Sequence, residues 1–237
     1  MIRTLLWKEW RENAWRLVYA ALLLPSFVAA GSTSPMIGSE TIGALMLFIG
    51  GVFIPCFLCM GLITTDRGSG CHRTLLALPA SPSTLLAVKA GLGAAGILLP
   101  FLFSAVLSGW LPYGSWPDAR TLAVYAGMAG FGVMLFLWTL AFSVRTARET
   151  HVALLGILVL VLWIVSLFPF VGARGLPWFV VSYNPIMALS WMLSPMQDTA
   201  NPLFPWECLG IAVVQIAILY GLWRWALRRY VLLESAP

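Results

Sequence analysis

One uncharged stretch of the chain, residues 42 to 64, has the sequence IGALMLFIGGVFIPCFLCMGLIT. A helix needs about 20 apolar residues to cross about 30 Å of hydrocarbon, because it rises about 1.5 Å per residue. This stretch is therefore long enough to span a lipid bilayer. An uninterrupted apolar run of this length is typical of a transmembrane helix.

Further apolar segments follow one another along the whole chain, at Leu17 to Gly31, Ala90 to Leu111, Leu122 to Ser143, Val152 to Val171 and Leu209 to Leu227. Of the 237 residues, 60% are hydrophobic and only 10% are charged, whereas a globular domain usually carries about 25% charged residues. No internal repeat or low-complexity linker divides the sequence. We therefore expect an all-α integral membrane protein with six transmembrane helices, folded as a single domain over residues 1–237.

The first residues, 1–16, have the pattern of an amphipathic helix lying in the membrane interface. Apolar side chains occupy one helical face and charged side chains the other: Ile2, Leu6, Trp10, Ala14 and Leu17 against Lys8, Arg11, Glu12 and Arg16. Glu12 and Arg16 have the spacing of a helical ion pair. A competing interpretation is a cleaved signal peptide, because Val28-Ala29-Ala30 resembles a cleavage site.

Basic residues indicate the orientation of the chain. With six spans, twelve of the 14 Lys and Arg residues lie on one side: Arg3, Lys8, Arg11, Arg16, Arg67, Arg73, Lys89, Arg145, Arg148, Arg224, Arg228 and Arg229. Only Arg120 and Arg174 lie on the other side. The positive-inside rule then places both termini in the cytoplasm, in a multi-pass protein of the cell membrane. Because the basic residues are dispersed at segment ends, the net charge of +5 does not indicate nucleic-acid binding.

Residues 176–195 form a seventh apolar stretch that Pro177, Asn184-Pro185 and Pro195 interrupt. A seventh span would move the three C-terminal Arg residues to the wrong side of the membrane. We therefore expect a re-entrant or interfacial hairpin between the fifth and sixth spans.

Within the six expected spans there is no Asp, Glu, Lys or Arg, which disfavours ion-coupled transport. The chain also lacks the G-x-x-x-x-G-K-[ST] loop that holds nucleotide phosphates. Any ATP hydrolysis must therefore occur on a separate subunit. Small residues at four-residue spacing, Ala87-Gly91-Ala95 and Ala123-Gly127, are expected to let neighbouring helices approach closely.

Two patterns could indicate chemistry. Cys56 and Cys59 form a C-x-x-C pair, with Cys71 and His72 after the same span, but a cysteine inside a lipid-embedded helix is also an ordinary small apolar residue. Ser69 and His72 could meet in a loop as a nucleophile and its base, although a flexible Gly-rich turn explains them equally well. Packing is the favoured interpretation of the cysteines, and we expect no metal site.

The loop between the second and third spans, residues 65–88, contains the sequence TDRGSGCHRTLLALPASPSTLLAV. Its Gly residues interrupt the span, and Thr74 to Leu78 can form a short helix that Pro79 ends. A short amphipathic helix at the cytoplasmic surface is either an interfacial linker or a docking element for another protein.

An acidic residue at the end of the second span, a Gly-rich turn, a Leu-Leu-x-Leu-Pro-x-Ser run and Lys89 opening the third span resemble the membrane subunits of type-2 ATP-binding-cassette (ABC) transporters. The resemblance also covers Trp7-Lys8-Glu9-Trp10 and Asn184-Pro185. Cys71-His72 departs from the family pattern, which more often has Gly-Thr before the Leu pair.

The resemblance implies a permease subunit, without catalytic residues or cofactor, that pairs with an identical or homologous second permease subunit in the lipid. ATP and Mg²⁺ would bind a separate nucleotide-binding ATPase subunit, and we expect an exporter. The implied ATPase-subunit interface consists of Asp66, Arg67, Gly68, Arg73, Leu75, Leu76, Leu78 and Pro79, with Trp7, Lys8, Trp10 and Arg11. Residues Arg145 to Glu149 would form a smaller contact. The alternatives are a membrane-embedded enzyme and an assembly scaffold.

Overall fold

The computed structural model describes residues 2–33, 47–68, 81–110, 117, 119–146, 148–170, 182–188 and 205–231, and none of these residues is in a strand. The elements are α1 (Ile2–Thr33), the π-helix η1 (Leu47–Phe53), α3 (Ile54–Gly68), α5 (Pro82–Trp110), α6 (Ala119–Ser143), α7 (Glu149–Val165), the 3-10 turn η2 (Phe168–Phe170) and α10 (Pro205–Val231). The expectation of an all-α protein is therefore confirmed for the described residues.

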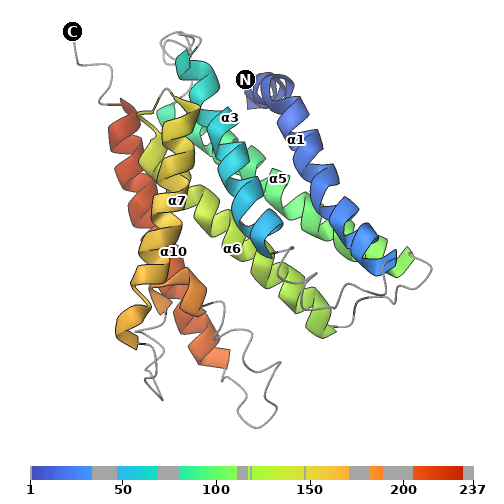
Figure 1. Cartoon of the computed structure of the whole chain (residues 1–237). Helices are drawn as coiled ribbons and strands as arrows, with labels where there is room; N and C mark the ends of the chain where they lie inside the picture. Colours follow the sequence, from blue (N-terminus) through green and yellow to red (C-terminus); the bar gives the residue numbers. More distant parts are fainter. Residues whose placement is uncertain are drawn as a thin grey trace.

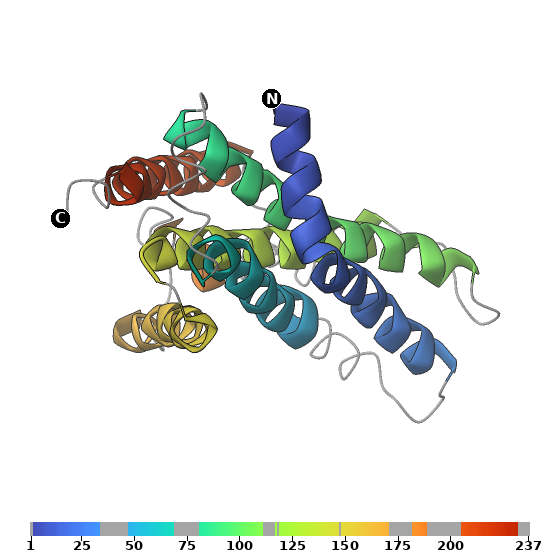
Figure 2. The same cartoon turned by 90° about the horizontal axis from the view of Figure 1, so that it is seen from above.

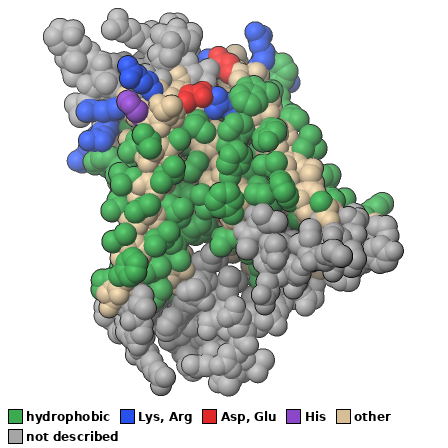
Figure 3. Space-filling model, in the orientation of Figure 1, with side chains coloured by type: hydrophobic (Ala, Val, Ile, Leu, Met, Phe, Trp, Pro, Cys, Tyr) green, Lys and Arg blue, Asp and Glu red, His purple; other side chains and the backbone are tan. Residues whose placement is uncertain are grey.

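The long helices alternate in direction (Figure 1). The start of α1, the end of α3, the starts of α5 and α7 and the end of α10 all lie at the top of this view. Figure 3 shows that the Lys, Arg, Asp and Glu side chains on this face gather there, above a wall of hydrophobic side chains. We call this end of the bundle the charged end.

Among the residues that the structure describes, five helical segments are long and apolar enough to cross a membrane: Ile2–Ala30, Leu47–Thr64, Pro82–Trp110, Leu122–Ser143 and Leu209–Tyr230. The protein is therefore a multi-pass membrane protein by the length and composition of its helices. Helix α7 is also apolar, but it has only 17 residues and is shorter than these five segments. It ends earlier than the expected Val171, at Val165, and Ser166 forms its C-terminal cap.

The expected boundary between an interfacial helix and the first span is not marked by a break in the helix. Instead, α1 is continuous from Ile2 to Thr33. It changes direction after its first turns, which cross the charged end (Figures 1 and 2). The apolar face of these turns is turned outward, with Ile2 57% and Leu6 40% exposed.

The loop between the second and third spans is also shorter than expected. Helix α3 continues beyond Thr64 to Gly68, and α5 begins at Pro82 rather than near Ala90. Ser81 caps α5, because its hydroxyl accepts a hydrogen bond from the Thr84 backbone N–H. Proline is favoured at the first helical position after such a cap, since its missing N–H has no partner there in any case.

Seen from above, α3, α5 and α6 lie in the middle, with α1 on one side and α7 and α10 on the other (Figure 2). Close helix packing depends on glycines other than those expected. Gly91 is exposed, and a Cβ there would meet no atom within 4 Å. A Cβ on Gly93 would instead come within 2.0 Å of the Phe136 ring of α6. The expected Ala87-Gly91-Ala95 stripe therefore does not form a helix contact along its length.

Of the expected hairpin, residues 176–195, the structure describes only residues 182–188. Asn184 is buried and its side-chain amide donates to Trp163 O (2.8 Å) and to Ser166 Oγ (2.6 Å). Its Oδ1 accepts from Ile186 N–H (2.9 Å), so Pro185 begins a short helical turn. This segment is thereby fixed to the end of α7; the rest of the expected hairpin lies outside the described residues.

Candidate functional site

Buried polar side chains come together at the charged end, where four helices meet, and one exposed carboxylate, that of Glu149, joins them. We call this group the polar cluster: Glu9, Asn13 and Arg16 of α1, Thr64 of α3, Lys89 of α5 and Glu149 of α7. Glu9, Asn13 and Arg16 lie on one side of α1 because they are spaced by three or four residues. In this region, the polar side of α1 therefore faces the neighbouring helices.

The centre of the polar cluster is an ion pair between α1 and α5. Lys89 Nζ lies 2.8 Å from Glu9 Oε1 and donates a second hydrogen bond to Leu62 O of α3 at 2.7 Å. Both residues are only 4% exposed. A buried charge is costly unless it is paired and hydrogen-bonded, and Lys89 meets both conditions. One ammonium group thereby connects three helices.

Arg16 forms the second connection. Its guanidinium donates to Phe57 O of α3 at 3.3 Å and pairs with Glu149 of α7 at 2.5 Å. The same group lies over the Phe57 ring, 5.4 Å from its centre. The expected pair of Arg16 with Glu12 is therefore wrong: Glu12 pairs with Lys8 at 2.8 Å.

Gly61 allows α1 and α3 to approach each other beside the polar cluster. A Cβ at this position would lie 2.5 Å from Asn13 Oδ1 and 2.6 Å from Arg16 Cδ. Any larger residue would displace one of these buried side chains. Because position 61 has no side chain, Arg16 can pass α3 and reach Glu149.

The polar cluster corrects one expectation, on Lys89, and bears on two others. Glu9, Arg16 and Lys89 lie within helices that are long enough to span a membrane, although outside the expected spans Leu17 to Gly31 and Ala90 to Leu111. Lys89 does not open α5, since it follows Pro82 by two helical turns. Glu149 pairs with Arg16 while 51% of its side chain stays exposed, and its expected contact with another subunit stays a prediction.

The expected ATPase-subunit interface is described only in part. Trp7, Trp10 and Arg11 are exposed on the first turns of α1, and Lys8 is half-buried. The backbone of Asp66, Arg67 and Gly68 forms the last turn of α3, while their side chains are not described. Arg73, Leu75, Leu76, Leu78 and Pro79 lie outside the described residues.

Cys56 and Cys59, the two cysteines of α3, pack against neighbouring helices. Cys59 is fully buried, with its Sγ 3.8 Å from Ser143 Oγ. Cys56 packs at Gly156 of α7, where a Cβ would come within 2.6 Å of its sulfur. Among the described residues, no group of three or more His, Cys, Asp or Glu could hold a metal ion. Cys71 and His72 lie outside those residues, as does Ser69.

A comparison of the chain with known protein families, with curated proteins and with solved structures finds no match in any of the three.

Asn13 was not predicted as a site residue, Glu9 was noted only within Trp7-Lys8-Glu9-Trp10, and Glu149 was expected only in a contact with another subunit. A signal for Glu9 and Asn13 does exist. Leu5, Glu9, Asn13 and Arg16 form a row of helical spacing on which three of four members are polar. In the structure every member of this row is buried.

Proposed function

We propose that this chain is the permease subunit of an ABC exporter. It crosses the cell membrane six times, with its charged end in the cytoplasm, and it encloses the substrate path together with a second permease subunit. A separate subunit binds ATP and Mg²⁺ and hydrolyses the nucleotide. The chain itself performs no bond chemistry.

The observation that carries this proposal is the attachment of α3 and α5 to the rest of the bundle at the charged end. In the sequence, these two helices flank residues 69–80, the segment that resembles a coupling helix. Lys89 joins the two helices directly, because it lies on α5 and donates a hydrogen bond to Leu62 O of α3. Glu9 then links Lys89 to α1.

Such an attachment suits the transmission of force. A load applied to residues 69–80 reaches α3 and α5 at their ends, and Lys89 passes it to α1. Arg16 extends the connection to α7 through Glu149. Because packed helices move as rigid bodies, a shift of these ends tilts the spans with which they are continuous. This is the movement that alternating access requires.

The outward-facing aromatic residues of α1 fit a second contact with the ATPase subunit or the membrane surface. Trp7 is 64% and Trp10 43% exposed, and exposed tryptophan is typical of a protein that meets lipid headgroups or a partner. Arg11 lies on the same exposed turns.

The test is the double substitution of Leu75 and Leu76 by Asp, which places two charges where the proposal expects an apolar groove of the ATPase subunit. Burying one Leu side chain contributes about 1.5 to 3 kcal/mol, so losing two should lower co-purification of the ATPase at least tenfold. The matched control is Ser81→Asp with Ser83→Asp. It adds the same charge at exposed positions and keeps a helix cap at position 81.

The measurements are co-purification of the ATPase subunit encoded with this chain and ATP hydrolysis by the reconstituted complex. We expect the Leu75/Leu76 variant to insert normally but to lose both complex and coupled hydrolysis, while the control keeps them. If the Leu75/Leu76 variant retained full complex and full hydrolysis, residues 69–80 would not be the coupling element.

A further inference from the structure

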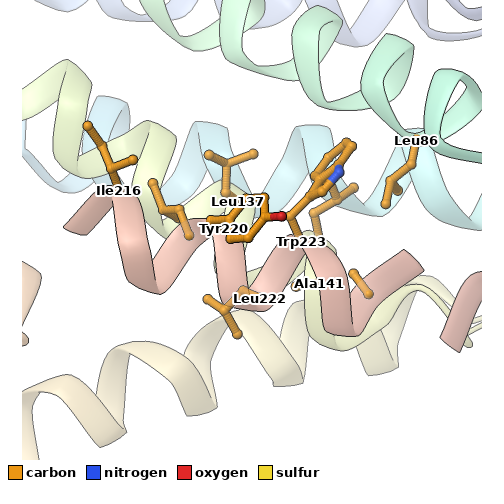
Figure 4. A pocket seen from close by; sticks show the side chains of 10 residues that line it. Leu86, Leu137, Ala141, Ile216, Tyr220, Leu222 and Trp223 are labelled. Carbon is orange, nitrogen blue, oxygen red and sulfur yellow. The ribbon is translucent and has the colours of Figure 1, made fainter. Parts of the chain in front are cut away.

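An apolar groove of about 280 Å³ lies between α5, α6 and α10 (Figure 4). Its floor is buried and is formed by Leu86 of α5, Leu140 and Ala141 of α6 and Ala226 of α10. Its rim is open, since Ile216 is 65% and Tyr220 63% exposed. A groove with a buried floor and an exposed apolar rim can take up a hydrophobic chain from the surrounding lipid.

The position of the groove along the bundle limits what can fill it. Leu86 lies one turn from Pro82, where α5 begins at the charged end. From Ala226 the groove follows α10 back to Ile216, ten residues away, which is about 15 Å at 1.5 Å per residue. This is half of a hydrocarbon core of about 30 Å, and therefore the depth of a single leaflet.

Basic residues flank the groove at the charged end. Arg224 follows Tyr220 by four residues and Arg229 follows Ala226 by three, so each continues a row of groove residues on α10. Arg224 is exposed and Arg229 half-buried, with its guanidinium 4.1 Å from the centre of the Trp225 ring. Positive charge therefore stands where the headgroup of a lipid in the groove would lie.

We propose that the groove between α5, α6 and α10 is a binding site for an anionic glycerophospholipid of the charged-end leaflet. One acyl chain fills the groove between Ile216 and Ala226, and the phosphate headgroup lies against Arg224 and Arg229. The groove volume of about 280 Å³ lies just below the range of about 300 to 1,000 Å³ for sites that enclose a whole drug-sized ligand, which favours a single chain over a bulkier ligand. The proposal depends only on membrane insertion and not on ABC transport.

The bound lipid would complete the packing of α10. This helix is the least buried of the five helical segments that could span a membrane, with 17% of its apolar window buried. A chain in the groove covers Ile216 and Tyr220 and fills the space beside Leu140 and Ala141. Loss of the lipid should therefore loosen α10 before the other helices.

The experiment is native mass spectrometry of the purified full chain from nanodiscs containing equal amounts of phosphatidylglycerol and phosphatidylcholine. We expect one retained lipid per chain, with phosphatidylglycerol favoured about tenfold. Ala141→Phe fills the floor of the groove and should abolish retention of both lipids. Gly221→Phe is its control on α10, because a Cβ there meets no atom within 4 Å.

If Ala141→Phe does not fold, Leu219→Trp is used in its place, because Leu219 lies on α10 and lines the same groove. The headgroup part is tested by Arg224→Gln with Arg229→Gln, which should remove the preference for phosphatidylglycerol and leave retention of phosphatidylcholine. Arg3→Gln with Arg11→Gln removes the same charge from exposed positions of α1 and should keep the preference.

Several results would overturn the proposal. Retention of lipid by a folded groove-filling variant would exclude an acyl chain in this groove. Equal loss of preference in both double Arg variants would show general attraction of anionic lipid rather than a site. Displacement of the retained lipid by millimolar inorganic phosphate would show that the headgroup alone is bound and would exclude the acyl-chain contact.

Discussion

Replacing Glu9 by Gln removes the carboxylate charge of the buried pair but keeps the size of the side chain. Lys89 is then left 4% exposed without the anion that now lies 2.8 Å from its Nζ. Breaking a buried pair in this way costs about 3 to 5 kcal/mol, because one charge remains buried without its partner. For a chain of this size, 3 kcal/mol lowers the melting temperature by about 6 to 12 °C.

The assay is thermal unfolding in detergent micelles, followed by tryptophan fluorescence. Glu12→Gln is the matched control: it removes the same charge from the same helix, but its pair with Lys8 is part-exposed and of the (i, i+4) type. Such pairs contribute about 0.3 to 0.5 kcal/mol. Glu9→Gln should therefore destabilise the protein several times more than Glu12→Gln.

The double variant Glu9→Gln with Lys89→Met removes both charges and should regain most of the loss. Lys89→Met alone should cost less than Glu9→Gln, because Lys8 Nζ remains 3.5 Å from Glu9 Oε1. We expect a coupling energy of at least about 2 kcal/mol between positions 9 and 89. Equal effects of Glu9→Gln and Glu12→Gln, or additive effects of the two single changes, would refute this account of the pair.

Three further outcomes follow from other contacts. Gly61→Ala should destabilise the protein by about 1 to 3 kcal/mol in the same unfolding assay, because its Cβ would lie 2.5 Å from Asn13 Oδ1, whereas Gly91→Ala should be neutral or slightly stabilising. Asn184→Ala should cost about 1 to 3 kcal/mol and speed hydrogen exchange at the end of α7, since it removes two hydrogen bonds to that end and a third within its own turn; unchanged exchange would contradict this role. The orientation can be tested at Cys71 in a variant that carries Cys208→Ser. Cys71 should react with an impermeant thiol reagent only after the membrane is opened, and labelling in intact cells would invert the proposed topology.

The amino-acid sequence by itself determined the class of the protein and the approximate place of its helices. The expected span Leu122 to Ser143 agrees with α6, which runs from Ala119 to Ser143. On the face that Figure 3 shows, the described Lys and Arg side chains also gather at one end of the bundle, as their positions in the sequence predicted. These features are accessible because apolar length and terminal charge are properties of each segment alone, without reference to its neighbours.

Helix ends and polar contacts were harder to predict. Lys89 marked the start of a span in the sequence because a charge normally ends an apolar run. In the structure it is tolerated two turns inside α5, since Glu9 and Leu62 O meet it there. A charge can therefore lie within a spanning helix when another helix supplies its partner, and a single apolar window does not contain that information.

Tertiary structure alone decided which side of each helix is buried. Glu9 and Lys89 are 80 residues apart in the chain, and they meet only because α1 and α5 pack with one particular rotation about their axes. The same rotations give Gly93 and Gly61 their close neighbours and leave Gly91 exposed. Burial of a side chain depends on the fit between two helices, and this fit is set by the shapes of both surfaces together rather than by the pattern along either one.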